Sequence, residues 1–176
     1  VIGFLGGGMR QWDFKMRGIK EVSETLAEYH IPFFLLLDET GRESDTLLAD
    51  FITIHQPGLV VTDFSPVRSM NTWVESLAHT ASISVVQVDA HNIVPCWVAS
   101  TKQEFGAYTL RPKLHALLPV FLEEFPKLVR ETIVYARPPK TISWKTILSH
   151  PQVHTSVPVV SWITPGEKAA QIHMKH

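Results

Sequence analysis

Three apolar runs of this 176-residue chain end in an aspartate, namely Asp38, Asp63 and Asp89. The carboxyl ends of parallel strands meet at one edge of a sheet, so these carboxylates are expected along that edge, where doubly wound folds bind ligands. At Asp38 and Asp63 the favoured alternative is that the aspartate caps the next turn or helix. Asp89 is followed by His91 and Asn92 instead of a helix, and for it both interpretations stay open.

The predicted ligand edge comprises Phe4, Asp63, Asp89, His91 and Asn92, and its expected occupant is a small nucleotide or a pigment. Gly6, Gly7 and Gly8 follow the first apolar run, where helix-start amides could hold a phosphate. However, Gln11 stands where the third glycine of a dinucleotide-binding fingerprint belongs, and no P-loop sequence occurs. A strand-to-helix turn is therefore the favoured interpretation of the glycines.

Other chemistries find little support in the sequence. The nine histidines are scattered, and prolines interrupt the one helical pair, His150 and His154, so no metal site is predicted. Cys96 lies outside any catalytic or metal-binding motif and is interpreted as a packed small residue. No apolar run approaches the roughly 20 residues that span a bilayer, so no membrane contact is expected. The formal charge of −1 gives no basic excess for unaided nucleic-acid binding.

The elements that would position the ligand edge follow from hydrophobic periodicity. Four short apolar runs have the composition of buried parallel strands. Helical patterns separate them, and Ser65-Pro66 is predicted to cap the third helix. Alternating strands and helices predict an α/β fold with a doubly wound parallel sheet. The strands are Val1–Gly6, Ile31–Asp38, Leu59–Phe64 and Ile83–Asp89, and the helices are Met9–His30, Glu43–His55 and Ser65–His79.

After Pro95 the alternation ends. A helix is predicted at Lys113–Glu124, a short one near Trp144–His150, and the start of another after Trp162, within an otherwise extended, proline-rich connector. We therefore predict an α/β domain over residues 1–95 and a partly helical linker over residues 96–176. The first residue is not methionine, and the chain is interpreted as a fragment.

Several segments resemble class II cyclobutane pyrimidine dimer photolyases, in the family's order. The most specific are VTDFSPVR (residues 61–68) and the run QVDAHNIVPCWVASTKQEFGAYTLRPK (residues 87–113). The others are RQWDFKMRGIKEV (10–22), FLEEFP (121–126) and WITPGEKAA (162–170). The resemblance implies a Rossmann-like N-terminal photolyase domain that lacks its first strand.

With the family's strand order 3-2-1-4-5, that loss predicts two separate parallel pairs. Val1–Gly6 would pair with Ile31–Asp38, and Leu59–Phe64 with Ile83–Asp89. Unpaired strand edges between the pairs predict poor stability and aggregation.

The resemblance implies light-driven, FAD-dependent repair of UV-damaged DNA by the full-length protein, inside the cell and in the nucleus if the source is eukaryotic. FAD and the damaged DNA would bind a helical flavin domain that this chain lacks, so the chain alone is expected to be inert and to bind no flavin. An antenna pigment is possible in the α/β domain. The alternatives are a stand-alone α/β ligand-binding module and a cryptochrome-type photoreceptor fragment.

One further surface is expected from the density of large and charged residues after Pro95. These residues are predicted to dock on the helical flavin domain, although they could instead fold back onto their own sheet. The predicted docking residues are Trp97, Lys102, Glu104, Phe105, Tyr108, Arg111 and Lys113.

Overall fold

A computed structural model describes residues 8–37, 44–149 and 155–175 of the chain. The predicted strand Val1–Gly6, with Phe4, and the predicted residues Asp38, His150 and His154 lie outside the described residues. The chain forms two compact units. The discontinuous unit comprises Val1–Leu35 with Leu128–His176, and the continuous unit comprises Leu36–Lys127. The predicted division after residue 95 stays a prediction.

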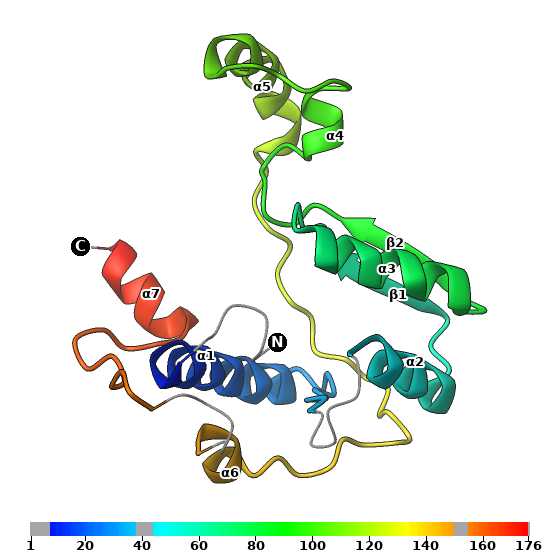
Figure 1. Cartoon of the computed structure of the whole chain (residues 1–176), viewed down its shortest axis with the longest axis vertical. Helices are drawn as coiled ribbons and strands as arrows, with labels where there is room; N and C mark the ends of the chain where they lie inside the picture. Colours follow the sequence, from blue (N-terminus) through cyan, green and yellow to red (C-terminus); the bar gives the residue numbers. More distant parts are fainter. Residues whose placement is uncertain (1–7, 38–43, 150–154, 176) are drawn as a thin grey trace. The chain divides into compact units, whose positions relative to one another are not determined.

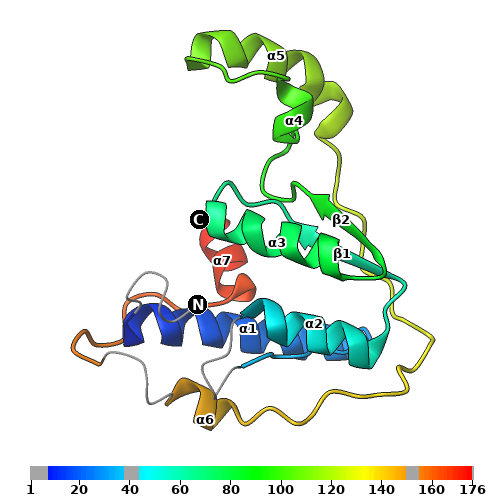
Figure 2. The same cartoon turned by 45° about the vertical axis from the view of Figure 1, so that its right-hand side comes forward.

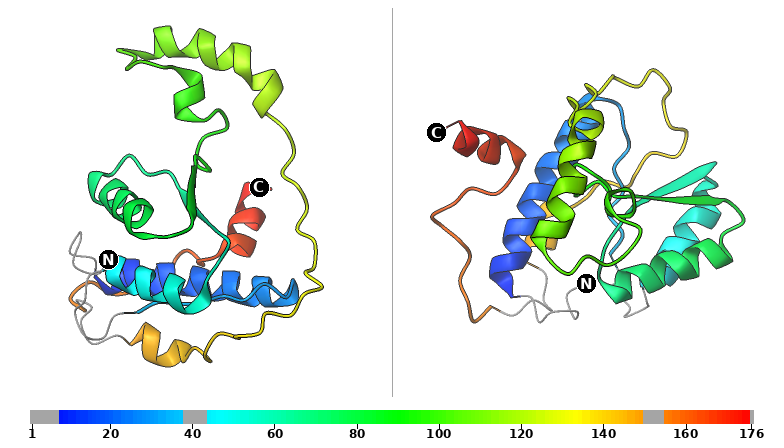
Figure 3. Two further views of the ribbon diagram at one scale, coloured as in Figure 1. Left: turned by 90° about the vertical axis from the view of Figure 1, so that its right-hand side faces the viewer. Right: turned by 90° about the horizontal axis from the view of Figure 1, so that it is seen from above.

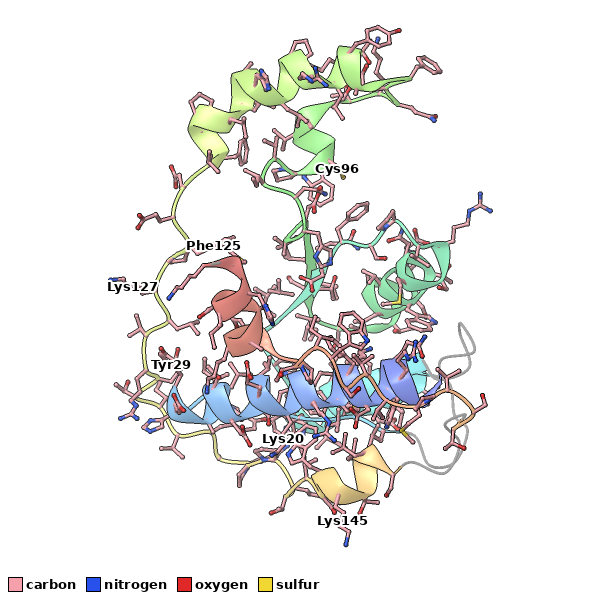
Figure 4. The ribbon with its side chains drawn as sticks, turned by 90° about the vertical axis from the view of Figure 1, so that its left-hand side faces the viewer. Lys20, Tyr29, Cys96, Phe125, Lys127 and Lys145 are labelled. Atoms are coloured by element: carbon pink, nitrogen blue, oxygen red, sulfur yellow. The ribbon has the colours of Figure 1, made fainter. Side chains whose placement is uncertain are left out.

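The discontinuous unit is organised by α1 (Met9–Glu28), which contacts α6 (Trp144–Leu148) and α7 (Glu167–Met174). The indole Nε1 of Trp12 donates a hydrogen bond of 2.7 Å to the carbonyl oxygen of Ile147 in α6. At the other end of α1, the carbonyl oxygen of Tyr29 accepts the N–H of Glu131 at 2.9 Å. Figure 4 labels Lys20 on α1, Tyr29 directly after it and Lys145 on α6. Residues more than 100 positions apart thus hold this unit together.

Gly166 sets the entry into α7 at a backbone conformation that only glycine adopts readily, with φ 109° and ψ 159°. A Cβ at this position would meet the carboxylate of Glu21. That carboxylate accepts the N–H of Lys168 in the first turn of α7 at 2.9 Å, which satisfies a helix-start donor. The P-G-E sequence therefore fixes how α7 joins α1.

Gly166→Ala is expected to lower the free energy of unfolding of the discontinuous unit by about 1–3 kcal/mol, because of backbone strain and the contact with Glu21. Chemical denaturation would measure this loss. Gly58→Ala is the matched control, since nothing lies within 4 Å of its Cβ and its φ is not positive. Equal effects at both glycines would contradict the assignment.

The continuous unit contains a two-stranded parallel sheet, with helices before, between and after its strands (Figure 1). Strand β1 (Leu59–Asp63) pairs in register with β2 (Ser84–Val88), from Leu59 opposite Ser84 to Asp63 opposite Val88. Helix α3 (Arg68–Thr80) connects the two strands and lies beside the pair in Figures 2 and 3. Helix α2 (Ser44–His55) precedes β1 and contacts α3. This part confirms the small α/β architecture and the predicted pairing of these two strands.

The two faces of this sheet differ in burial. Val60, Thr62, Val85 and Gln87 are half-buried, whereas Val61 is 60% exposed and Val86 and Val88 are each 44% exposed. Both strands belong to runs that are nearly continuously apolar in sequence, which predicted burial on both faces. Within the continuous unit only one face is covered, so the doubly wound arrangement is not confirmed.

Two further helices complete the continuous unit, α4 (Cys96–Ala99) and α5 (Ala107–Phe121), which contact each other. Figure 1 shows α4 beside α5, and in Figure 4 Phe125 and Lys127 lie on the extended segment that follows α5. The predicted start of this helix at Lys113 was wrong by six residues. Helix α5 begins at Ala107 and accommodates both Pro112 and Pro119 in its interior.

Two other predicted elements differ from the structure. Residues 31–37 form no strand, because no described residue offers them a ladder partner, and Phe34 instead makes an edge-to-face contact with Tyr135 at 6.1 Å. The predicted cap of α3 at Ser65 was also wrong. Helix α3 begins at Arg68 after Val67, and the Ser65 hydroxyl accepts the Val67 N–H at 3.3 Å in a turn before the helix.

Candidate functional site

Asp63 and Asp89 stand at the carboxyl ends of neighbouring strands. Asp63 is the last residue of β1 and lies opposite Val88, and the N–H of Phe64 donates to the Val88 carbonyl oxygen at 2.7 Å. Asp89 follows directly, so both carboxylates belong to one edge of the sheet. Their surroundings differ, since Asp63 is exposed whereas Asp89 is only 5% exposed.

The Asp89 carboxylate is fully engaged with the loop that follows it, and we call this arrangement the Asp89 clamp. Its Oδ1 accepts the backbone N–H of Asn92 at 3.3 Å and the side-chain Nδ2 of Asn92 at 3.0 Å. Its Oδ2 accepts the same Nδ2 at 2.9 Å and the backbone N–H of Cys96 at 2.9 Å. The Cys96 bond reaches seven residues along the chain and ties the start of α4 to the end of β2.

These donors lower the pKa of Asp89, first through the Asn92 side chain and then through the Cys96 N–H, because they stabilise the ionised form. Asp89 and Asn92 thus satisfy each other instead of presenting free polar groups to a ligand. Cys96 is exposed, unlike the packed residue that the sequence predicted, and Figure 4 shows it at the start of α4. Partial desolvation, followed by the neighbouring Asp89 charge, raises the pKa of its thiol.

The remaining residues of the predicted ligand edge do not converge on one site. His91 and Asn92 line a groove beside α5, whereas Asp63 lines a separate cavity between the sheet and α3. The hypothesis that the glycines hold a phosphate also loses support at Gly8. The Gly8 N–H already donates a hydrogen bond of 3.1 Å to the side-chain oxygen of Gln11. Asp63 and His91 are the described members of the edge that remain available to a ligand, and they line separate sites.

The Asp63 cavity has a volume of about 320 Å³ and lies on the half-buried face of the sheet. Trp73, Val74 and Leu77 of α3 contribute apolar walls, and Thr62, Ser65 and Gln87 contribute polar groups. The hydroxyl Oγ1 of Thr62 is buried and has no hydrogen-bond partner. An unsatisfied hydroxyl beside a cavity fits a small polar ligand or an antenna pigment, and sequence patterning missed it because a threonine in a strand is ordinary.

Thr62→Val is expected to raise the free energy of unfolding by about 1 kcal/mol, since it removes an unpaired buried hydroxyl without changing side-chain shape. Urea denaturation would measure the gain. Thr72→Val on α3 is the control, because the Thr72 hydroxyl donates to the Arg68 carbonyl oxygen at 3.1 Å and its loss should not stabilise. A destabilised Thr62→Val protein would show that the hydroxyl has a partner in solution.

A second polar cluster, the Glu104 cluster, joins the segment after α4 to α5. The ammonium of Lys113 forms an ion pair with Glu104 and donates to the Ser100 hydroxyl at 3.0 Å. Ser100 in turn donates to Glu104 Oε1 at 2.7 Å. Hydrogen bonds from Lys113, Ser100 and Thr109 lower the pKa of Glu104 to about 2. Two of the predicted docking residues, Glu104 and Lys113, are thereby engaged within their own segment.

The aromatic docking residues are exposed. Phe105 is 93% and Tyr108 is 78% exposed, whereas Trp97 is 46% exposed and meets Phe64 edge-to-face at 5.3 Å. Lys102 and Arg111 are exposed as well. Trp97 thus folds back on the strand end, while Phe105 and Tyr108 face outward. Ser100 is the member of this region that sequence reasoning missed, because its role depends on a side chain thirteen residues away.

Neither a metal site nor a membrane-spanning helix is found among residues 8–37, 44–149 and 155–175. In these ranges no three histidine, cysteine or acidic side chains are grouped to hold a metal ion. No helix in the same ranges combines the length and apolar character needed to cross a bilayer.

Comparison with known proteins adds independent evidence. The family model of DNA photolyase matches residues 4–130. The chain is 45% identical over 165 residues to a deoxyribodipyrimidine photo-lyase of Potorous tridactylus, covering 93% of the chain and 30% of that protein. It is 34% identical over 171 residues to the Arabidopsis thaliana photo-lyase, covering 94% and 34%. It is 31% identical over 172 residues to that of Oryza sativa subsp. japonica, covering 94% and 33%.

The chain thus spans about a third of the length of the curated relatives that it matches. The motifs at residues 61–68 and 87–113, which carried the resemblance, fall within the range of the family model. The chain belongs to the DNA photolyase family.

Proposed function

We propose that this chain is the N-terminal part of a class II deoxyribodipyrimidine photo-lyase, which uses light and FAD to split UV-induced cyclobutane pyrimidine dimers in DNA. The observation that carries this proposal is the 45% identity to the Potorous tridactylus photo-lyase over 93% of the chain. The D-F-S-P and V-D-A-H-N sequences, which belong to the resemblance, lie at the ends of β1 and β2.

FAD and damaged DNA are assigned to a helical domain of the longer protein, and none of the described residues is assigned to either. FAD supplies the light-driven electron chemistry when bound. The residues of this chain have a supporting role: the Asp89 clamp fixes the exit from the sheet, and the Glu104 cluster fixes α5 behind it. On this proposal the chain alone binds no flavin and repairs no dimer.

An antenna pigment remains part of the proposal, with a changed location. The predicted edge of Phe4, Asp63, Asp89, His91 and Asn92 included two side chains that the Asp89 clamp occupies. The Asp63 cavity, with the unpaired Thr62 hydroxyl, is the part that still fits a small ligand. A pigment would be recognised there by the polar groups of Thr62 and Gln87 and by the apolar walls of α3.

The test is light-dependent repair of a dimer-containing oligonucleotide, followed by chromatography of the restored strand. The full-length product of the gene that encodes this chain is expected to be yellow and to repair in light only. The 176-residue chain is expected to be colourless and inactive. Repair by the chain alone would contradict the assignment of flavin binding and repair to the helical domain.

The two alternatives have distinct signatures in the same assay. A full-length product that binds flavin without repairing dimers would indicate a cryptochrome-type photoreceptor. A stand-alone ligand-binding module would bind a nucleotide or pigment tightly in the Asp63 cavity, with no flavin protein encoded in frame. The identity to three deoxyribodipyrimidine photo-lyases favours repair over both.

A further inference from the structure

We propose that a groove beside α5 receives an acidic amphipathic helix from the helical domain of the same polypeptide. This inference rests on the proposed function and specifies the chemistry of the docking partner. The groove has a volume of about 560 Å³ and runs between residues 91–94 and α5, all within the continuous unit. Figure 1 shows α5 with this strand-to-helix connection beside it.

The floor of the groove is apolar. Leu110, Leu114 and Leu118 of α5 line it at intervals of four residues, and Val94, which is only 4% exposed, closes it from the opposite side. The three leucines are half-buried, so they present a continuous stripe that the continuous unit leaves uncovered. Over eight residues such a stripe extends roughly 12 Å, about two turns of a partner helix. This is the spacing with which helix-in-groove recognition places its anchors.

The rim of the groove carries one guanidinium and two imidazoles. Arg111 and His115 stand four residues apart on α5, and His91 lines the groove from the loop. All three are exposed, and none of their side chains makes a hydrogen bond or ion pair with the described residues. No aspartate or glutamate lines the groove, and the α5 sequence AYTLRPKLHALLPVF contains neither. Carboxylates on the partner would complement this rim and select its register.

The floor and rim together favour a protein segment over a nucleic acid, because a phosphate backbone would leave the leucine stripe uncovered. The curated relatives are about three times as long as this chain, so the family's polypeptides supply ample chain for such a helix. An intramolecular partner also needs little intrinsic affinity, since tethering gives it a high effective concentration. The groove would then orient the helical domain against the α/β part.

The test is zero-length carbodiimide cross-linking of the full-length gene product, which joins amines to carboxylates only where they touch. Arg111→Lys keeps the charge and adds an amine at the rim. Tryptic mass spectrometry is expected to find position 111 joined to an acidic residue of a helix beyond residue 176 of the same polypeptide. Ala116→Lys is the matched control, since Ala116 is exposed on α5 and does not line the groove, and this cross-link should be lost.

Other outcomes would overturn the inference. A cross-linked dimer would show that a second copy occupies the groove, and a link to Glu123 or Glu124 would show that the chain covers it itself. No cross-link at position 111, or equal yields for both variants, would show that no acidic partner is seated there. Repair activity of the wild-type protein, measured in parallel, separates failure of this inference from failure of the proposed function.

Discussion

Replacing Asp89 by alanine is expected to unfold the segment from Asp89 to Cys96 and to lower the thermal midpoint of the continuous unit by several degrees. The substitution leaves the N–H groups of Asn92 and Cys96, and the Asn92 amide, without the acceptor that they share. These hydrogen bonds are partly buried, and a partly buried donor that loses its acceptor costs more than a lost surface contact. Asp89→Asn should be nearly as damaging, because its NH₂ group must face one of the same donors.

Asp63→Asn is the control for this prediction, since it alters the carboxylate at the neighbouring strand end, which is exposed. It should leave stability unchanged. Hydrogen exchange of residues 89–96 and alkylation of Cys96 would report the local effect, and both should accelerate at Asp89 alone. The Asp89 clamp is expected to weaken in acid, because the folded chain lowers the pKa of Asp89. Its contribution to the free energy of unfolding is present above the ordinary pKa of 3.8 and is lost as the carboxylate protonates below that value. Unchanged exchange in Asp89→Ala would show that the loop holds itself.

Acidification is expected to release α5 from the segment that precedes it. The pKa of Glu104 falls from its ordinary value of 4.5 to about 2, first because Lys113 donates to it and then because Ser100 does. Because folding lowers the pKa of Glu104, its carboxylate stabilises the fold above pH 4.5, and this stabilisation is lost as the pH falls toward 2. Amide exchange in α5, corrected for intrinsic rates, should therefore rise over this interval.

Glu104→Gln should show the released behaviour already at pH 6, with exchange in α5 roughly tenfold faster than in the wild-type chain and little further change on acidification. Glu123→Gln serves as the control, since Glu123 is exposed and makes no hydrogen bond or ion pair with described residues. It should retain the wild-type pH profile. A Glu104→Gln profile that still follows that of the wild-type chain would refute the Glu104 cluster as the source of the transition.

Hydrophobic periodicity predicted β1, β2 and the helices around them, because each of these elements buries one face against elements that are near it in sequence. It placed α1 at residues 9–30 and α2 at 43–55, against Met9–Glu28 and Ser44–His55. It failed at residues 31–37, where an apolar composition suits a strand but pairing requires a neighbour that composition cannot supply. It also failed at the start of α5, which it placed at Lys113, whereas the helix begins at Ala107 and runs through Pro112.

The site was less predictable than the fold. The sequence pattern predicted that Asp63 and Asp89 lie at one edge of the sheet. It did not predict which groups their side chains contact. Asp89 is occupied because Asn92 and Cys96 return to it through the turn after β2. The partner of Glu104 likewise lies nine residues away, and Thr62 is noticeable only because nothing satisfies its hydroxyl. Each of these facts depends on side-chain direction, which the residue pattern does not specify.

The order in which the ribosome releases the chain bears on the discontinuous unit. Helix α1 emerges before its partners, which follow 102 to 148 residues later, from the Arg130 contact with Glu28 to the Pro158 contact with Arg10. At ordinary translation speeds this delay is roughly 5–30 s. During that time β1, α3 and β2 can close, because they are adjacent in sequence, while α1 stays without its cover. Slowed elongation, or loss of a chaperone that shields nascent helices, should therefore damage the discontinuous unit before the continuous one.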